Sequence, residues 1–219
     1  LAGDDQLRPP LPFEDKRLLA TLKHTFWFLP SVAACHAMGD LLKQPENGFF
    51  HDYKIVVAAG AKAGIGLDAL PPVRNAISRA GLGTRSITLS CMKLTTGITV
   101  PEWSGIFMLR NLNSPETYFQ AAFRVQSPWT TNEVDPVEGE VVHYLKPSCY
   151  LLDFSPNRAL RLITDYATQL DPDPDISKES KVEEFLKYLP VLCYDGYRMQ
   201  EMNADDLLDF VIAGTGSTM

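Results

Sequence analysis

Short apolar runs alternate with longer segments of helical periodicity from Thr25 onward. Apolar runs of roughly four to eight residues bounded by turn residues are typical of buried strands, whereas apolar residues three or four positions apart indicate helices. Because helix-length segments separate the apolar runs, the pattern predicts an α/β domain with a mainly parallel sheet. The predicted strands cover residues 25–29, 54–58, 86–91, 105–109 and 149–154.

Serine and proline residues mark the starts of several predicted helices. Ser31 can accept a hydrogen bond from the first turn of a helix, and Ser114 with Pro115 combines a capping hydroxyl with a ring that suits the first helical position. Pro71 and Pro72 supply the first turn of another helix. The helices predicted around the sheet cover residues 32–42, 73–80, 116–125 and 157–170.

Two polar segments interrupt this alternation. Residues 127–147 are polar and acidic, so we expect a long surface connection or a flexible insertion before the last strand. The charged, proline-broken sequence DPDPDISKES indicates a linker, and helices 181–189 and 204–212 are predicted after it. The expected organisation is a connecting segment at 1–19, a lobe at 20–170, and an acidic linker with a helical extension at 171–219.

The formal net charge of −7 is unevenly distributed along the chain. Residues 1–130 hold 13 Lys and Arg against 10 Asp and Glu, a balance of +3, whereas residues 131–219 hold 7 against 17, a balance of −10. Because nucleic-acid phosphates favour Lys and Arg, we expect any nucleic-acid surface in the first part of the chain.

The cysteines and the first residues bear on compartment and processing. The four cysteines lack metal-ligand spacing, so we expect no metal site and a reducing, cytoplasmic environment. No apolar run approaches the roughly 18 residues of a membrane span. The first residues, LAGDDQLRPP, lack an initiator methionine and the pattern of a signal peptide, which indicates a piece of a longer polypeptide.

The polar segment after the third predicted strand carries candidate binding chemistry. Gly97 allows a ligand to approach the backbone closely, and threonine hydroxyls flank it. Arg124 offers a planar guanidinium suited to phosphate, and Gln120 lies four residues earlier on the same helical face. Ligands bind beyond the carboxyl ends of the strands in an open α/β sheet, so this combination predicts a phosphate site. The flanking hydroxyls belong to Thr95, Thr96 and Thr99.

Two of these segments resemble motifs of superfamily 2 helicases. CMKLTTGITVP resembles motif V, with the glycine at Gly97. YFQAAFRVQS resembles motif VI, a Gln-x-x-x-Arg-x-x-Arg helix, with Gln120 and Arg124 in place.

A third segment, FWFLPSV, resembles motif IV, so three motifs follow one another in the family's order over about residues 20–155. The forms of motifs V and VI look most like those in motor subunits of type I and type III restriction enzymes. The resemblance implies a RecA-like three-layer lobe with a C-terminal helical extension.

The resemblance also implies a role for each candidate residue. Arg124 would place a cation against the charge that develops on the transferred phosphate of ATP, and Gln120 would orient it or contact the phosphate. Gly97 and Thr99 would face the nucleotide, while ATP and Mg²⁺ would be bound mainly by a first RecA-like lobe. The residues implied to face DNA phosphates are Pro30, Ser31, Lys93, Thr95 and Thr96.

The motifs are incomplete at two positions. Thr99 stands where motif V has an acidic residue, and Ser127 replaces the last arginine of motif VI. The sequence also lacks a GxxxxGKS/T phosphate loop and a DExx box. We therefore expect the second motor lobe of an ATP-dependent DNA helicase or translocase of a restriction–modification system, inactive in isolation. Its expected partners are double-stranded DNA, the first lobe, and nuclease or methyltransferase domains of the same polypeptide.

Other functions stay open. A degenerate lobe would bind DNA or a partner protein without catalysis, which Thr99 and Ser127 favour. A Rossmann-type cofactor domain would use AAGAKAGIG, but its glycines do not give the GxGxxG spacing. A hydrolase triad lacks a GxSxG elbow, and we expect all four histidines to be structural.

Overall fold

The computed structural model describes residues 16–60, 66–77, 82–91, 94, 97–135, 139–194 and 199–216. These residues form two compact units. The sheet unit contains Lys16–Asn111 and Phe119–Phe154, and the helical unit contains Leu112–Tyr118 together with the described residues from Ser155 onward.

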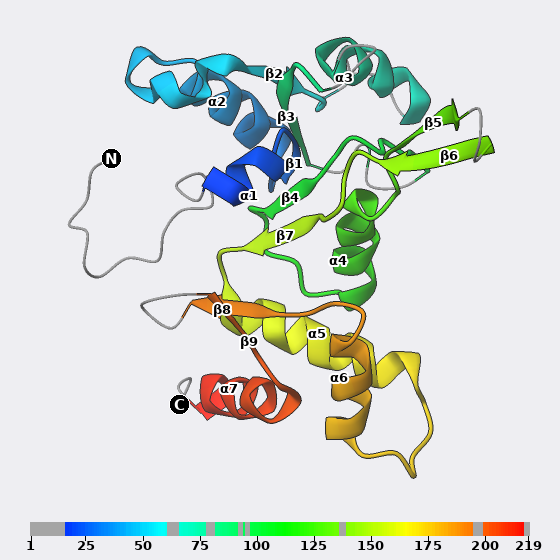
Figure 1. Ribbon diagram of the computed structural model, residues 1–219. Helices are drawn as coiled ribbons and strands as arrows, with labels where there is room; N and C mark the ends of the chain where they lie inside the picture. Colours follow the sequence, from blue (N-terminus) through cyan, green and yellow to red (C-terminus); the bar gives the residue numbers. More distant parts are fainter. Residues whose placement is uncertain are drawn as a thin grey trace. The chain divides into compact units, whose positions relative to one another are not determined.

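Five parallel strands form the central sheet of the sheet unit (Figure 1). They lie in the order β2-β3-β1-β4-β7, so the first strand is central and pairs with β3 and β4. All four strand pairs are parallel, which confirms the predicted α/β fold, and each strand begins and ends within one residue of its predicted bounds. The strands are β1 His24–Phe28, β2 Tyr53–Val57, β3 Arg85–Ser90, β4 Gly105–Met108 and β7 Tyr150–Asp153.

Helices cover both faces of this sheet. The helix α2, Val32–Leu42, connects β1 to β2, and α3, Leu70–Ile77, connects β2 back to β3. The two crossovers run in opposite directions along the sheet, and right-handed crossovers in opposite directions place their helices on opposite faces. The helix α2 packs closely against the sheet, as Gly39 shows: a Cβ added there would lie only 2.9 Å from the Val57 side chain of β2. The resulting three layers are consistent with a RecA-like domain.

The core of the sheet unit centres on β1, whose five residues are all buried. The rings of Phe26 and Trp103 are fully buried, with their centroids 4.8 Å apart. Burying an apolar side chain of this size contributes roughly 1.5–3 kcal/mol relative to leaving it exposed. Since a parallel sheet is covered on both faces, its strands appear in the sequence as continuous apolar runs, and this explains why they could be predicted.

Ser31 and Ser114 cap helices as predicted. Each hydroxyl accepts a hydrogen bond from the main-chain N–H three residues later, at 3.1 Å and 3.2 Å respectively. The helix α4, Pro115–Ala122, is shorter than predicted and continues as a 3₁₀ turn, Phe123–Val125. Further short helices of the sheet unit are α1, Lys16–Thr21, and the 3₁₀ helices Pro45–Asp52 and Gly66–Ala69.

The predicted surface connection at 127–147 is wrong in one respect, because it contains an antiparallel hairpin. Its strands are β5, Thr130–Asp135, and β6, Gly139–Tyr144. Gly139 has a φ of 82°, a left-handed conformation that glycine adopts without a steric penalty. The hairpin is polar on much of its surface, so its strands lack the apolar runs that identify the central sheet.

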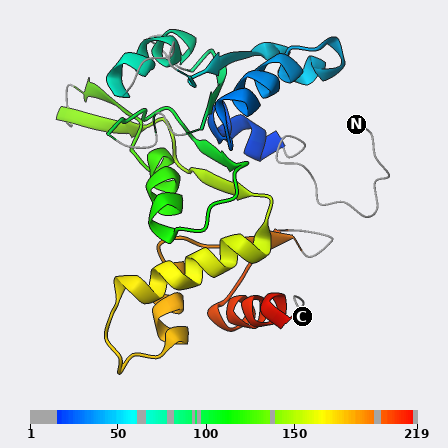
Figure 2. The same ribbon diagram turned by 180° about the vertical axis from the view of Figure 1, so that it is seen from behind.

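The helical unit is built on α5, Pro156–Leu170, against which the two remaining helices pack (Figure 2). The helix α6, Lys178–Leu186, begins three residues earlier than predicted because Ser177 caps it. A short hairpin, β8 Leu192–Tyr194 with β9 Met199–Glu201, was not predicted and precedes α7, Ala204–Gly216. The expected domain boundaries at 19 and 170 stay a prediction.

Candidate functional site

The segment 97–104 lies between β3 and β4 in the sequence and directly precedes β4. Three cationic side chains stabilise it through hydrogen bonds. Four of its main-chain carbonyl oxygens accept hydrogen bonds from Arg74, Arg124 and Lys146. Hydrogen bonds that involve a charged donor are stronger than neutral ones. The segment therefore has a defined path although it contains no helix or strand.

Arg124 provides the contact between the two segments that resemble motifs V and VI. Its Nη1 donates to the carbonyl oxygen of Ile98 at 2.6 Å, and the guanidinium is partly buried. Ile98 lies between Gly97 and Thr99, so the structure brings the predicted arginine to the segment that carries both of these residues. Gln120 lies on α4, four residues before Arg124, and is exposed.

Gly97 and Thr99 are both exposed on this segment. Gly97 has a φ of 68°, and a Cβ placed on it would have no heavy atom within 4 Å. The backbone at this glycine is therefore accessible to a ligand. Leu94, which is buried, also has a positive φ of 66°. This conformation costs a non-glycine residue about 1–2 kcal/mol, and such strain is concentrated at functional sites.

Arg74 of α3 anchors the same segment from the other side. Its Nη1 donates to both carboxylate oxygens of Glu102, at 2.9 Å and 2.8 Å, and its Nη2 donates to the carbonyl oxygen of Thr99 at 3.1 Å. Hydrogen bonds between two charged groups are stronger than neutral ones, so the carboxylate restrains the guanidinium that binds Thr99. The backbone of Thr99 is thereby oriented from α3.

Lys146 follows the β5–β6 hairpin and is only 8% exposed. Its Nζ donates to three carbonyl oxygens, those of Pro101 at 2.7 Å, Trp103 at 2.9 Å and Val125 at 2.7 Å. Burial, which penalises the charged form, lowers the pKa of Lys146 below its ordinary value of 10.5. The three acceptors match the three N–H donors of an ammonium group.

The predicted DNA-facing residues divide between two groups. Pro30 and Ser31 follow β1 at the carboxyl edge of the sheet and are exposed, although the Ser31 hydroxyl is engaged as a helix cap. Lys93, Thr95 and Thr96 lie outside the described residues.

Arg110 is a cation that sequence reasoning missed. It lies two residues after the end of β4, at the same carboxyl edge, and its Nη1 donates to the carbonyl oxygen of Cys91 at 2.7 Å. The guanidinium also lies 5.5 Å from the centre of the Phe28 ring. An arginine directly after a buried strand was a usable signal, since such positions meet at one edge of a parallel sheet.

Arg74, Glu102 and Lys146 were also missed. Their contacts span 21 to 45 residues of sequence, so no local pattern could indicate them. The histidine prediction fits what is seen for His24, which is buried, with Nδ1 2.9 Å from Ser86 Oγ.

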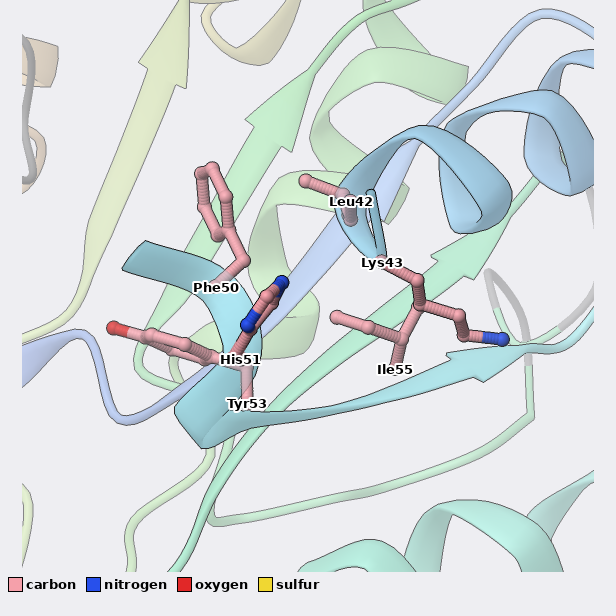
Figure 3. A pocket seen from close by; sticks show the side chains of 6 residues that line it. All are labelled: Leu42, Lys43, Phe50, His51, Tyr53 and Ile55. Atoms are coloured by element: carbon pink, nitrogen blue, oxygen red, sulfur yellow. The ribbon is translucent and has the colours of Figure 1, made fainter. Parts of the chain in front are cut away.

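A shallow groove lies elsewhere on the sheet unit (Figure 3). It has a volume of about 270 Å³ and is formed by the end of α2, the Pro45–Asp52 helix and β2. None of the predicted site residues lines it. Its walls are formed by Leu42, Lys43, Phe50, His51, Tyr53 and Ile55.

Neither a metal-binding cluster nor a membrane-spanning helix is present in the part of the chain that the structure describes. No group of three or more His, Cys, Asp or Glu residues there could hold a metal ion. Likewise, no helix among those residues is long and apolar enough to cross a membrane.

The chain is similar in sequence to a known protein over most of its length. The chain is 32% identical over 186 residues to a Mycoplasma pneumoniae protein described as the C-terminal part of a candidate type II restriction enzyme and methyltransferase. The match covers 84% of this chain and 24% of the relative, so the chain spans about a quarter of the relative's length. No protein-family model matches the sequence.

Proposed function

We propose that this chain is the second RecA-like lobe of a superfamily 2 helicase or translocase, in which it completes an ATP site and grips DNA. We place that motor in a restriction–modification protein, because the relative is described as a restriction enzyme and methyltransferase. Since the match covers only a quarter of the relative, the other parts of the motor would come from further domains of the same polypeptide. A protein of this kind works in the cytoplasm.

The observation that carries the proposal is the contact between Arg124 and the segment 97–104. A guanidinium, an accessible glycine backbone and a threonine are clustered on two neighbouring segments. These groups suit a nucleotide, since arginine matches phosphate geometry and an open glycine allows close backbone approach. Arg124 would stabilise charge on the transferred phosphate, and Gly97 and Thr99 would face the ribose.

The residues present fit half of an ATP site. Gln120, Gly97 and Thr99 are exposed, so they are available to a nucleotide that another lobe holds. The sequence has neither a phosphate loop nor a DExx box, which are the groups that bind the phosphates and Mg²⁺. The lobe would therefore contribute to hydrolysis only when it is joined to its partner lobe.

The carboxyl edge of the sheet would form the DNA side of the lobe. Pro30 and Ser31 are exposed there, and Arg110 adds a positive charge at the same edge. Lys93, Thr95 and Thr96 complete this proposed set. Contacts of this kind position a protein on the phosphate backbone without reading sequence.

The test is ATP hydrolysis by the full-length protein with and without double-stranded DNA. The proposal predicts turnover that DNA stimulates and that this chain alone does not support. A full-length protein that binds DNA but hydrolyses no ATP would contradict it.

Two departures from the family motifs and one hydrogen bond favour a second candidate function, that of a non-catalytic lobe that binds DNA or a protein. Thr99 and Ser127 replace charged motif residues, and the Nη1 of Arg124 is already bonded to a main-chain carbonyl. Such a lobe would show salt-sensitive DNA binding in the full-length protein without ATP turnover.

A further inference from the structure

Lys146 links the two segments that carry the proposed ATP-facing residues. Two of its acceptors, Pro101 and Trp103, belong to the segment that contains Gly97 and Thr99. The third acceptor, the carbonyl of Val125, directly follows Arg124 at the end of the 3₁₀ turn. One ammonium group therefore bridges both halves of the proposed site.

A buried ammonium is a costly way to connect two segments of a fold. Transfer of a charge out of water is unfavourable unless hydrogen bonds replace its hydration, and here all three donors have carbonyl partners. Packing of apolar side chains would stabilise the same region with no such cost. The lysine instead fixes the geometry of the region, because three acceptors around one nitrogen set the distance between the two segments.

We propose that Lys146 is a positioning residue that couples DNA binding to ATP hydrolysis. This inference rests on the proposed function. The segment after β3 begins at Cys91, whose carbonyl accepts a hydrogen bond from Arg110 at the proposed DNA edge, and it is joined to Lys146 near its other end. A movement of this segment is transmitted through the ammonium to Val125 and so to the adjacent Arg124.

The β5–β6 hairpin restrains the main chain next to Lys146. The main-chain N–H of Leu145 donates to the carbonyl of Trp129 at 2.8 Å, next to the Thr130–Tyr144 pair of the hairpin. The backbone on the N-terminal side of Lys146 is therefore tied to the segment that follows the 3₁₀ turn. The side chain can transmit displacement because its own main chain is restrained.

The test compares Lys146→Met with the wild type in the full-length protein. The ratio of DNA-stimulated to basal ATP turnover is expected to fall by about tenfold, within the usual range of coupling between two sites. Lys54→Met is the matched control, because Lys54 is an exposed lysine on β2 of the same unit. That control should keep the wild-type ratio.

Lys146→Arg provides a second variant that keeps the charge. A planar guanidinium cannot replace an ammonium that donates to three carbonyls around one nitrogen, so this variant is also expected to lose stimulation. Circular dichroism and thermal unfolding establish that each variant is folded.

The outcomes separate the inference from the proposed function. If the wild type shows no DNA-stimulated turnover, the proposed function fails and this inference fails with it. If the wild type is stimulated and either folded variant keeps its ratio, only the role of Lys146 is overturned. Failure of both variants to fold also overturns it, because Lys146 would then be required for the fold.

Discussion

Arg124 and Ile98 are joined by a hydrogen bond of 2.6 Å from the guanidinium Nη1 to a main-chain carbonyl oxygen. The contact spans 26 residues and unites the two segments that carry the proposed nucleotide-facing groups. It has two consequences that experiments can separate. It stabilises the path of the segment 97–104, and it keeps a cation beside exposed Gly97 and Thr99.

Removal of the Arg74–Glu102 pair should destabilise the sheet unit. Glu102→Gln or Arg74→Ala is expected to lower the free energy of unfolding by about 1 kcal/mol, a modest figure because solvent screens the more exposed Arg74. Urea denaturation measures the change. Lys187→Ala removes the surface pair with Glu184 and is the control, with no measurable change expected. If Lys187→Ala lowered the free energy of unfolding as much as Arg74→Ala does, the structural role of Arg74 would be contradicted.

Lys146 should make stability depend on pH in the alkaline range. Burial lowers the pKa of Lys146 in the folded protein below the ordinary value of 10.5 that applies in the unfolded chain. As the pH rises, the folded protein therefore releases this proton at a lower pH than the unfolded chain does. Between the two pKa values the unfolded state binds more protons, so the free energy of unfolding rises with pH. Urea denaturation at about pH 8 and about pH 10 should show this gain in the wild type relative to Lys146→Met. A constant difference between the proteins would argue against the lowered pKa.

Cys35 should be unreactive in the folded protein. Burial is the main cause that raises its pKa to about 12, so almost none of it is the nucleophilic thiolate near neutral pH. Cys193 is only partly buried and should be alkylated first. Mass spectrometry after iodoacetamide treatment measures both sites, and the urea-unfolded protein gives the reference rates. Native labelling of Cys35 as rapid as that of Cys193 would contradict the packing of α2 on the sheet.

Arg110→Ala should weaken DNA binding by the full-length protein to a similar extent on every sequence. Loss of one phosphate contact is expected to reduce the slope of log K against log salt by about one. Fluorescence anisotropy over a series of salt concentrations gives that slope. Arg85→Ala is the control, because Arg85 begins β3 and so lies at the amino end of the strands. If the slope changed equally in Arg110→Ala and Arg85→Ala, the proposal that DNA binds at the carboxyl edge of the sheet would be contradicted.

The sequence predicted the central sheet well because burial on both faces leaves a strong local signal. The five strands and α2 were found from apolar runs and from the capping residue Ser31. The β5–β6 hairpin was missed, since cross-strand pairing rather than burial stabilises it and its composition is polar. Its position between α4 and β7 could not be distinguished from a surface loop by composition alone.

The candidate site was predicted only in part. The motif resemblance singled out Arg124, Gly97 and Thr99, and the structure places them on two adjacent segments. The side chains that hold these segments, Arg74 and Lys146, donate to main-chain carbonyls 21 to 45 residues away. A carbonyl acceptor leaves no mark in the sequence, so these partners could be identified only once the fold was known.

The central claim is tested most directly by the DNA-stimulated ATP turnover of the full-length protein carrying Arg124→Ala. We expect kcat to fall by about a thousandfold, the scale of an arginine that stabilises a transferred phosphate, with DNA affinity nearly unchanged. Arg124→Lys keeps the charge without the planar fork and should restore little activity. A variant that is less stable but turns over ATP at the wild-type rate would show that Arg124 only holds the Ile98 carbonyl, and the account would be wrong.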